Sequence, residues 1–387
     1  MTKAAQKAGA AVPLLDLARQ YAAIRDEVMA AIERVCASQH FILGEEVAAL
    51  EREISAYTGA AETVACASGT DALWLSLLAL NVGPGDEVVT TPFSFFASAS
   101  AIVRAGARPV FVDIDPLTFN LDPVKLERKF AAYPPTRAKA IIPVHLYGQV
   151  AEPDAFRRIA AVHDLAVLED AAQAFGAAWR GKRAGTLGTL AAFSFYPSKN
   201  LSAFGDAGCV TTSDHKLAEH LRSLRNHGSA QRYFHEELGW NSRLDAIQAA
   251  VLRVKLKHLD GWNTQRAERA ATYDRLLTDA GLAGGEGSPI RLPQRAQEAR
   301  HILHQYVVRA QRRDALRATL AERGIATEIY YPLPIHLQNA FVYLGYAAGD
   351  FPEAERAAAE VLALPMFPEL REDEQRAVVE AVSDFYS

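Results

Sequence analysis

Short β-rich runs alternate with helical patterns between about residue 12 and residue 260, and this alternation restricts the possible folds more than any other feature of the chain. Helical patterns at residues 71–80, 95–105 and 153–163 separate most of the earlier β-rich runs. Because strand–helix–strand units favour parallel pairing, the pattern predicts an α/β fold with a mostly parallel sheet covered by helices. The expected strands cover residues 63–67, 87–90, 108–112, 139–143, 165–168, 190–195 and 208–212.

The C-terminal part of the chain has a different pattern. A long helical region, clearest at residues 243–259, precedes the glycine-rich segment 281–289, which is typical of a boundary or a surface loop. Beyond it we expect a strand near residues 305–310, a helix near 314–323 and two C-terminal helices. A chain of 387 residues is long enough for two domains. We therefore predict a large domain over residues 12–260 and a smaller α/β domain over residues 261–387.

Composition excludes several classes of partner. The net charge of -5 gives no general attraction to nucleic acid or to anionic lipid, and no apolar run is long enough to span a bilayer. The three cysteines, Cys36, Cys66 and Cys209, are too few and too scattered for a disulfide framework or a cysteine-rich metal site. Residues 1–11 lack the apolar core of a signal peptide, so we expect a cytoplasmic protein.

Two residues with the chemistry to serve one cofactor follow expected strands. Asp170 comes just after the run at 165–168, and Lys199 comes just after the aromatic run at 190–195. In parallel sheets, ligands bind beyond the carboxyl ends of the strands. A lysine amine can form a Schiff base with pyridoxal phosphate (PLP), and a carboxylate can keep its ring nitrogen protonated so that the ring accepts electrons. The ordinary alternatives are a solvated surface lysine and an aspartate that caps a helix beginning at Ala171.

Neighbouring segments could hold the same cofactor. Ser68-Gly69-Thr70-Asp71 lies between a strand and a helix, where the first N–H groups of the helix can bind a phosphate, or where a serine or threonine simply caps it. Gln173 follows Asp170 by about one helical turn and could reach the same ring, although a surface glutamine fits the pattern as well. Ser194 can donate to a phosphate or end a strand. The pair Phe95-Phe96 can stack on a flat ring or pack in the core.

Taken in order, these segments resemble the DegT/DnrJ/EryC1/StrS family of PLP-dependent nucleotide-sugar aminotransferases. The resemblance covers residues 13–387 and implies a PLP-dependent transferase fold type I, which is aspartate aminotransferase-like. That fold has a large domain around a seven-stranded sheet and a smaller C-terminal domain, and the family forms homodimers with active sites at the subunit interface. The matching segments are Ser68-Gly69-Thr70-Asp71-Ala72-Leu73, Glu169-Asp170-Ala171-Ala172-Gln173, Ser194-Phe195-Tyr196-Pro197-Ser198-Lys199-Asn200, Asn226-His227-Gly228, Gly239-Trp240-Asn241-Ser242-Arg243-Leu244-Asp245, Phe41-Ile42-Leu43-Gly44 and Leu364-Pro365-Met366-Phe367-Pro368.

The resemblance also implies a role for each matched residue. Lys199 would carry the Schiff base and Asp170 would pair with the ring nitrogen, so these two are the expected catalytic residues. The other cofactor contacts would come from Gly69, Thr70 and Ser194 at the phosphate, from Phe96 on the ring face, from Gln173 at the ring hydroxyl, and from Asn241 reaching the phosphate in the neighbouring subunit. Substrate contacts would come from Arg243, Tyr331 and His336, with Arg243 equally able to serve as a structural ion-pair partner.

The implied reaction moves an amino group from L-glutamate to a nucleotide-linked keto sugar and so makes an amino sugar. The segment Gly205-Asp206-Ala207-Gly208 after the lysine looks more like members that act on 3-keto sugars than like those that act on 4-keto sugars. A 4-keto-sugar aminotransferase and a non-catalytic regulatory protein on the same fold remain the alternatives. A sugar dehydratase of the same family does not fit, since the lysine is retained and the cysteines form no cluster motif.

Overall fold

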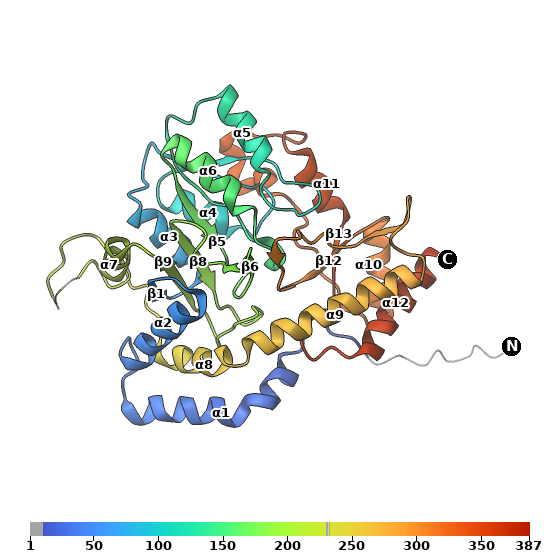
Figure 1. The fold of residues 1–387 in the computed structure, drawn as a ribbon, viewed down its shortest axis with the longest axis horizontal. Helices are drawn as coiled ribbons and strands as arrows, with labels where there is room; N and C mark the ends of the chain where they lie inside the picture. The colour runs from blue at the N-terminus through green and yellow to red at the C-terminus, as the bar shows by residue number, and fades with distance from the viewer. Residues whose placement is uncertain (1–10, 230, 232) are drawn as a thin grey trace.

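The computed structural model describes residues 11–229, 231 and 233–387. Its centre is a seven-stranded sheet in the order β1-β9-β8-β5-β4-β2-β3 (Figure 1). All neighbouring pairs from β3 to β8 are parallel, whereas β9 runs antiparallel to both β8 and β1. The predicted mostly parallel sheet is therefore confirmed. Its strands are β1 (Glu62–Cys66), β2 (Glu87–Thr90), β3 (Arg108–Phe111), β4 (Ala138–Ile141), β5 (Ala166–Asp170), β8 (Leu190–Ser194) and β9 (Gly208–Thr212).

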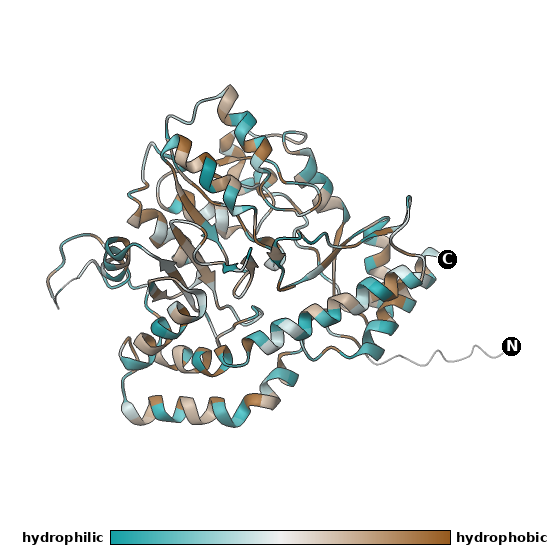
Figure 2. Cartoon of the chain, in the orientation of Figure 1, coloured by the Kyte–Doolittle hydropathy of each residue, from teal (hydrophilic) through white to brown (hydrophobic). Residues whose placement is uncertain are grey.

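Helices cover both faces of this sheet, because the strands are apolar on both sides. One layer pairs α3 (Gly69–Ala79), α4 (Ala97–Arg104) and α7 (His215–Leu224) with side chains such as Leu168 and Val210. The opposite face packs on α5 (Pro123–Ala132) and α6 (Pro153–His163), with α2 (Glu45–Thr58) and α8 (Ala246–Leu256) beside them. Hydropathy is highest along the central strands and lowest on the outer sides of the helices (Figure 2).

The C-terminal part contains a second core around an antiparallel sheet. Its strands are β10 (Ile290–Arg291), β12 (Tyr306–Ala310) and β13 (Val361–Leu364), and its helices are α10 (Arg313–Glu322), α11 (Pro352–Glu360) and α12 (Glu372–Tyr386). Val12 bridges to Ile325, so the start of the described chain lies against this core. The boundary between residues 260 and 261 stays a prediction.

The expected long helical region, clearest at 243–259, is confirmed and consists of two helices, α8 and α9 (Leu259–Asp279). The chain turns at Lys257 and His258, and α9 then runs from the large sheet toward the C-terminal sheet (Figure 1). The remaining elements are α1 (Leu17–Ser38), which packs on α8, the short strands β6 (Ala178–Trp179), β7 (Lys182–Arg183) and β11 (Ala299–Arg300), and the 3-10 turns η1 (Leu146–Gly148), η2 (Ile335–Leu337) and η3 (Asn339–Leu344). Among the described residues, no helix is long and apolar enough to cross a membrane.

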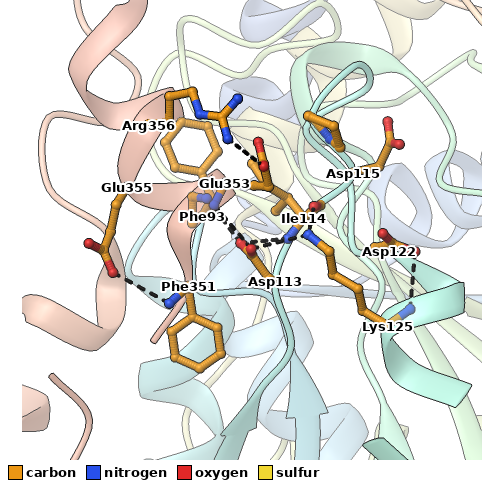
Figure 3. Close-up of polar contacts among 12 residues, drawn as sticks. Phe93, Asp113, Ile114, Asp115, Asp122, Lys125, Phe351, Glu353, Glu355 and Arg356 are labelled. Carbon is orange, nitrogen blue, oxygen red and sulfur yellow. Dashed lines mark hydrogen bonds and ion pairs between the residues drawn. The ribbon is translucent and has the colours of Figure 1, made fainter. Parts of the chain in front are cut away.

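Asp113 joins the two cores (Figure 3). Its carboxylate follows β3 and accepts hydrogen bonds from the backbone N–H groups of Glu353 and Ala354, at 3.0 and 2.9 Å, in the first turn of α11. Lys125 Nζ pairs with the same carboxylate at 3.1 Å. A residue 240 positions away thus acts as the N-terminal cap of α11, which fixes the C-terminal core against the large sheet.

Candidate active site

The expected catalytic residues lie at the carboxyl edge of the large sheet. Asp170 is the last residue of β5, and Lys199 follows β8 in the turn after Ser194. The alternative that Asp170 caps a helix is wrong, because residues 171–177 form successive turns. The N–H of Ala171 donates to the carbonyl of Ala192 on β8, so the chain stays tied to the sheet instead of starting a helix.

Asp170 is held in a buried polar environment. Its carboxylate is 4% exposed, and Oδ2 accepts a hydrogen bond of 2.6 Å from Ser98 Oγ on α4. Burial raises the pKa of the Asp170 carboxyl, and the Ser98 hydrogen bond acts in the opposite direction. A protonated ring nitrogen placed beside Asp170 would supply the positive charge that stabilises the ionised form.

Lys199 lies beside this carboxylate in an environment that weakens its charge. Burial lowers the pKa of Lys199 to about 8, and the attraction of Asp170 opposes that shift. A buried amine with a lowered pKa has a larger neutral fraction near pH 7, as Schiff-base chemistry requires. A solvated surface lysine would have neither property.

The turn that carries Lys199 is fixed through the next residue. Asn200 donates from Nδ2 to Asn263 Oδ1 at 2.7 Å, and its Oδ1 is 3.0 Å from His304 Nδ1. Because the Asn200 amide nitrogen is already donating, Oδ1 accepts from a protonated His304 Nδ1. The lysine thus sits on a turn clamped from α9 and from the segment before β12.

Gln173 reaches from the same edge toward the C-terminal part. Its Oε1 accepts from the backbone N–H of Tyr147 at 2.7 Å, and its Nε2 donates to the Tyr331 hydroxyl at 3.1 Å. The structure therefore brings Tyr331, expected at the substrate, next to the residue expected at the ring hydroxyl. Gln173 is buried, which excludes the surface-glutamine alternative.

The first turn of α3 packs closely against the ends of β8 and β9. A Cβ on Gly69 would lie 2.5 Å from Ser194 Cβ, and a Cβ on Gly208 would lie 2.4 Å from the Ser68 carbonyl carbon. Ser68 Oγ caps the helix by accepting from the N–H of Asp71 at 3.1 Å. The N–H groups of Gly69 and Thr70 and the Ser194 hydroxyl are thus gathered at one helix N-terminus, as a phosphate site needs. Together with Asp170, Gln173 and Lys199, they fit pyridoxal phosphate.

The two phenylalanines before α4 point to different neighbours. Phe95 is 58% exposed, and its ring centroid is 6.2 Å from that of Tyr331, which contacts Gln173. Phe96 is 43% exposed and lies 5.2 Å from Phe341 in η3. Phe95 is therefore the ring beside Tyr331, the partner of Gln173, whereas the motif match selected Phe96.

Three expected contacts lie apart from this group. Asn241 is exposed and bridges to Asn226, whose Oδ1 accepts from Arg243 Nη1 at 3.1 Å. No hydrogen bond within the described residues joins Asn241 or Arg243 to Asp170 or Lys199. His336 is 2% exposed, and its Nε2 is 3.1 Å from Glu355 at the start of α11.

Sequence reasoning did not identify the buried hydrogen bond beneath the site, between His145 and Glu169. Glu169 precedes Asp170 and lies 3.0 Å from His145 Nε2, with both side chains 1% exposed. The same carboxylate accepts the N–H groups of Gly185, Leu187 and Gly188. The only available signal was an acidic residue inside an apolar strand, which indicates a buried polar network but not its partners.

The geometry agrees with the comparison to known families. The model for the DegT/DnrJ/EryC1/StrS aminotransferase family matches residues 22–383. The chain belongs to this family. The expectations of an aminotransferase of fold type I and of a pyridoxal phosphate cofactor are confirmed with it.

Relatives of this DegT/DnrJ/EryC1/StrS chain carry both enzymatic and regulatory names. A "pleiotropic regulatory protein" of Geobacillus stearothermophilus is 52% identical over 97% of this chain and 98% of its own length. The UDP-N-acetyl-3-dehydro-alpha-D-glucosamine 3-aminotransferase of Acidithiobacillus ferrooxidans is 45% identical over 94% and 95%. The dTDP-3-amino-3,4,6-trideoxy-alpha-D-glucose transaminase of Streptomyces venezuelae is 46% identical over 97% and 96%.

The crystal structure of S. venezuelae DesV in complex with a ketimine intermediate has the same fold as this family member. It superimposes with a TM-score of 0.91 at 46% identity and covers 97% of this chain and 98% of DesV.

Proposed function

We propose that this aminotransferase moves the amino group of L-glutamate to carbon 3 of a nucleotide-linked 3-keto sugar, with the cofactor held at Lys199. The observation that carries the proposal is the half-buried Lys199 with its lowered pKa, beside Asp170 and on the turn that follows Ser194, against which the helix N-terminus at Gly69 packs. Such a group is poised for proton transfer, whereas a purely structural role would not need an amine at this place.

Bound pyridoxal phosphate supplies the electron sink that stabilises negative charge on the carbon next to the amino group. Within each half-reaction Lys199 would act first as general base and then as general acid: it would move a proton from the donor carbon to the cofactor in one half, and from the cofactor to carbon 3 of the sugar in the other. Asp170 would hold the positive charge on the ring nitrogen, and Ser98 would hold Asp170 in place. Phe95, alongside Phe96, would cover the ring face.

Carbon 3 is supported by two relatives with different nucleotides. One is named for a UDP-linked 3-dehydro sugar and the other for a dTDP-linked 3-amino sugar. Both names refer to carbon 3, whereas the nucleotides differ. The proposal therefore specifies the carbon and leaves the nucleotide open. A substrate panel in which only 4-keto sugars accept the amine would contradict it.

We also propose that the protein is a cytoplasmic homodimer in which both subunits contribute residues to each active site. Asn241 and Arg243 are joined through Asn226, on a segment that has no hydrogen bond to Asp170 or Lys199 in the described part of its own chain. An isologous dimer would place this segment of each subunit at the site of the other. Sedimentation that finds an active, cofactor-loaded monomer would refute this arrangement.

The test is the absorption spectrum of the purified protein with and without L-glutamate. We expect the band of bound pyridoxal phosphate to be replaced by that of the aminated cofactor, and to be lost or unresponsive in Lys199→Ala. Lys182→Ala, which removes an exposed lysine on β7, is the matched control and should behave as wild type. A wild-type protein that binds no pyridoxal phosphate would contradict the proposal.

A regulatory role is the second candidate, because the relative with 52% identity is named for regulation. A regulatory protein would bind the cofactor, but no amino acid would convert the bound cofactor to its aminated form. The same spectra therefore separate the two candidates.

A further inference from the structure

The two residues on either side of Asn241 attach their segment to helix α3. Ser242 Oγ donates a hydrogen bond of 2.7 Å to Asp71 Oδ2, in the first turn of α3. The ring centroid of Trp240 lies 4.4 Å from that of Trp74, about one turn further along the same helix, and the two rings meet edge to face. The backbone before and after Asn241 is therefore fixed by α3.

The side chain of Asn241 faces away from this helix. An antiparallel bridge to Asn226 keeps the backbone extended at Asn241, and successive side chains of an extended chain point to opposite sides. Accordingly Ser242 is 1% exposed, whereas Asn241 is exposed. The Asn241 amide forms no hydrogen bond within the part of the chain that the structure describes. The fold thus holds an amide in one direction without giving it a partner there.

Asp71 connects the same segment to a second helix of the large domain. Its Oδ1 pairs with Arg104 Nη1 at 2.6 Å, at the end of α4, and the Arg104 guanidinium lies 3.5 Å from the centre of the Trp74 ring. Both carboxylate oxygens of Asp71 are therefore engaged, and charge-assisted hydrogen bonds of this kind are strong and directional. The acceptor for Ser242 is held in place from α3 and from α4.

We propose that Asp71 and Ser242 are positioning residues that hold Asn241 toward the cofactor phosphate of the neighbouring subunit. Each α3 then supports both sites of the dimer. Its N-terminus faces the phosphate in its own subunit, and its Asp71 holds the segment that completes the other site. A backbone that is fixed before binding loses less conformational entropy when the amide donates to a phosphate. This assignment rests on the homodimer of the proposed function.

The first test is the dissociation constant of pyridoxal phosphate, from titration of the cofactor-free variants followed by the absorption of cofactor bound at Lys199. Asn241→Ala should raise this constant about 10- to 100-fold, as for a lost hydrogen bond to a charged group. Ser242→Ala should raise it about 3- to 10-fold, because Asn241 is kept but is no longer fixed before binding.

The double variant shows whether the two residues act through one contact. Asn241→Ala with Ser242→Ala should bind within about 2-fold of Asn241→Ala alone, whereas independent effects would multiply. Ser76→Ala is the matched control, because it removes a buried serine hydroxyl from the same helix that donates only to the carbonyl of Ala72. The control should bind as wild type.

Hybrid dimers separate an effect on the neighbouring site from a structural effect within one subunit. Two hybrids each contain one Lys199→Ala and one Ser242→Ala substitution, so that a single site in each gives the absorption band. With Ser242→Ala in the subunit that keeps Lys199, that site receives an unaltered segment from its neighbour and should bind as wild type. With both substitutions in one subunit, the site in the other should be as weak as in the Ser242→Ala homodimer.

Equal dissociation constants for the two hybrids, or wild-type binding by the Ser242→Ala homodimer, would overturn the assignment. If Ser242→Ala fails to fold, Trp240→Leu weakens the other anchor and keeps Ser242, and the same difference between hybrids is expected. The matching hybrids made with Asn241→Ala test the shared site itself. If those also bind alike, the homodimer with shared sites is refuted; if they differ while the Ser242→Ala hybrids bind alike, only the role of Ser242 is refuted.

Discussion

Replacing Gly69 by alanine tests the contact on which the phosphate site depends. The new Cβ would lie 2.5 Å from Ser194 Cβ and 3.1 Å from Ser194 Cα. Carbon atoms in contact lie about 3.5–4.0 Å apart, so α3 and β8 would have to separate by about 1 Å. Because Ser194 Cα belongs to the sheet, no side-chain rotation removes the clash, and overpacking of this kind costs about 1–3 kcal/mol.

The displacement should weaken cofactor binding more than it lowers the stability of the fold. The N–H groups in the first turn of α3 and the Ser194 hydroxyl must point at one phosphate, and a shift of about 1 Å breaks at least one of these hydrogen bonds. Hydrogen bonds to charged groups contribute about 1.5–3 kcal/mol each, so the dissociation constant of pyridoxal phosphate should rise about 10- to 100-fold.

The assay is titration of the cofactor-free protein with pyridoxal phosphate, followed by absorption, alongside denaturant unfolding. Gly83→Ala is the matched control, since a Cβ there meets nothing within 4 Å and its φ is not in the left-handed region. The control should bind as wild type. If Gly69→Ala also bound as wild type with unchanged unfolding, the helix N-terminus would not be the phosphate site.

Three further predictions concern single side chains. Ser98→Ala removes the 2.6 Å donor that lowers the pKa of Asp170, so this pKa should rise and the acid limb of the rate profile should move to higher pH; an unmoved limb would contradict this role. Cofactor capture by the cofactor-free enzyme needs the neutral amine of Lys199, so its rate should rise with pH and level off above about 8; a rise continuing to the usual lysine range near 10.5 would show that burial does not act as described. Asp113→Ala leaves two N–H groups of α11 without their acceptor and should lower the free energy of unfolding by about 1–3 kcal/mol, measured by denaturant titration; a loss below about 0.5 kcal/mol would show that the cap contributes little.

The sequence was sufficient for the sheet because its strands are short apolar runs with clear interruptions. The strands at 87–90 and 208–212 were predicted with the bounds that β2 and β9 have in the structure. The strand at 190–195 is one residue longer than β8, and the strand at 63–67 is shifted by one residue from β1. The order of the strands and the antiparallel direction of β9 depend on pairing across the sheet. Local patterns contain no information on that pairing.

Several features of the site depend on contacts between distant segments, which local sequence patterns do not show. Ala171-Ala172-Gln173 has helix-forming composition, yet the hydrogen bond from Ala171 to Ala192 on β8 holds it in turns. Phe95 and Phe96 are adjacent and chemically identical, so only the path of the chain into α4 decides which ring faces Tyr331. Arg266 binds carbonyls from two distant segments, and a helical pattern on α9 cannot reveal them.

The energetic cost of the site favours catalysis over regulation. Asp170 is buried and Lys199 is half-buried, and burial shifts the pKa of each toward its neutral form, which means that folding loses hydration free energy at both positions. Apolar residues of similar size would make a more stable core at these places. A protein that only needed this fold for contacts with a partner would gain stability by losing both, whereas an enzyme needs both when cofactor and amino acid are bound.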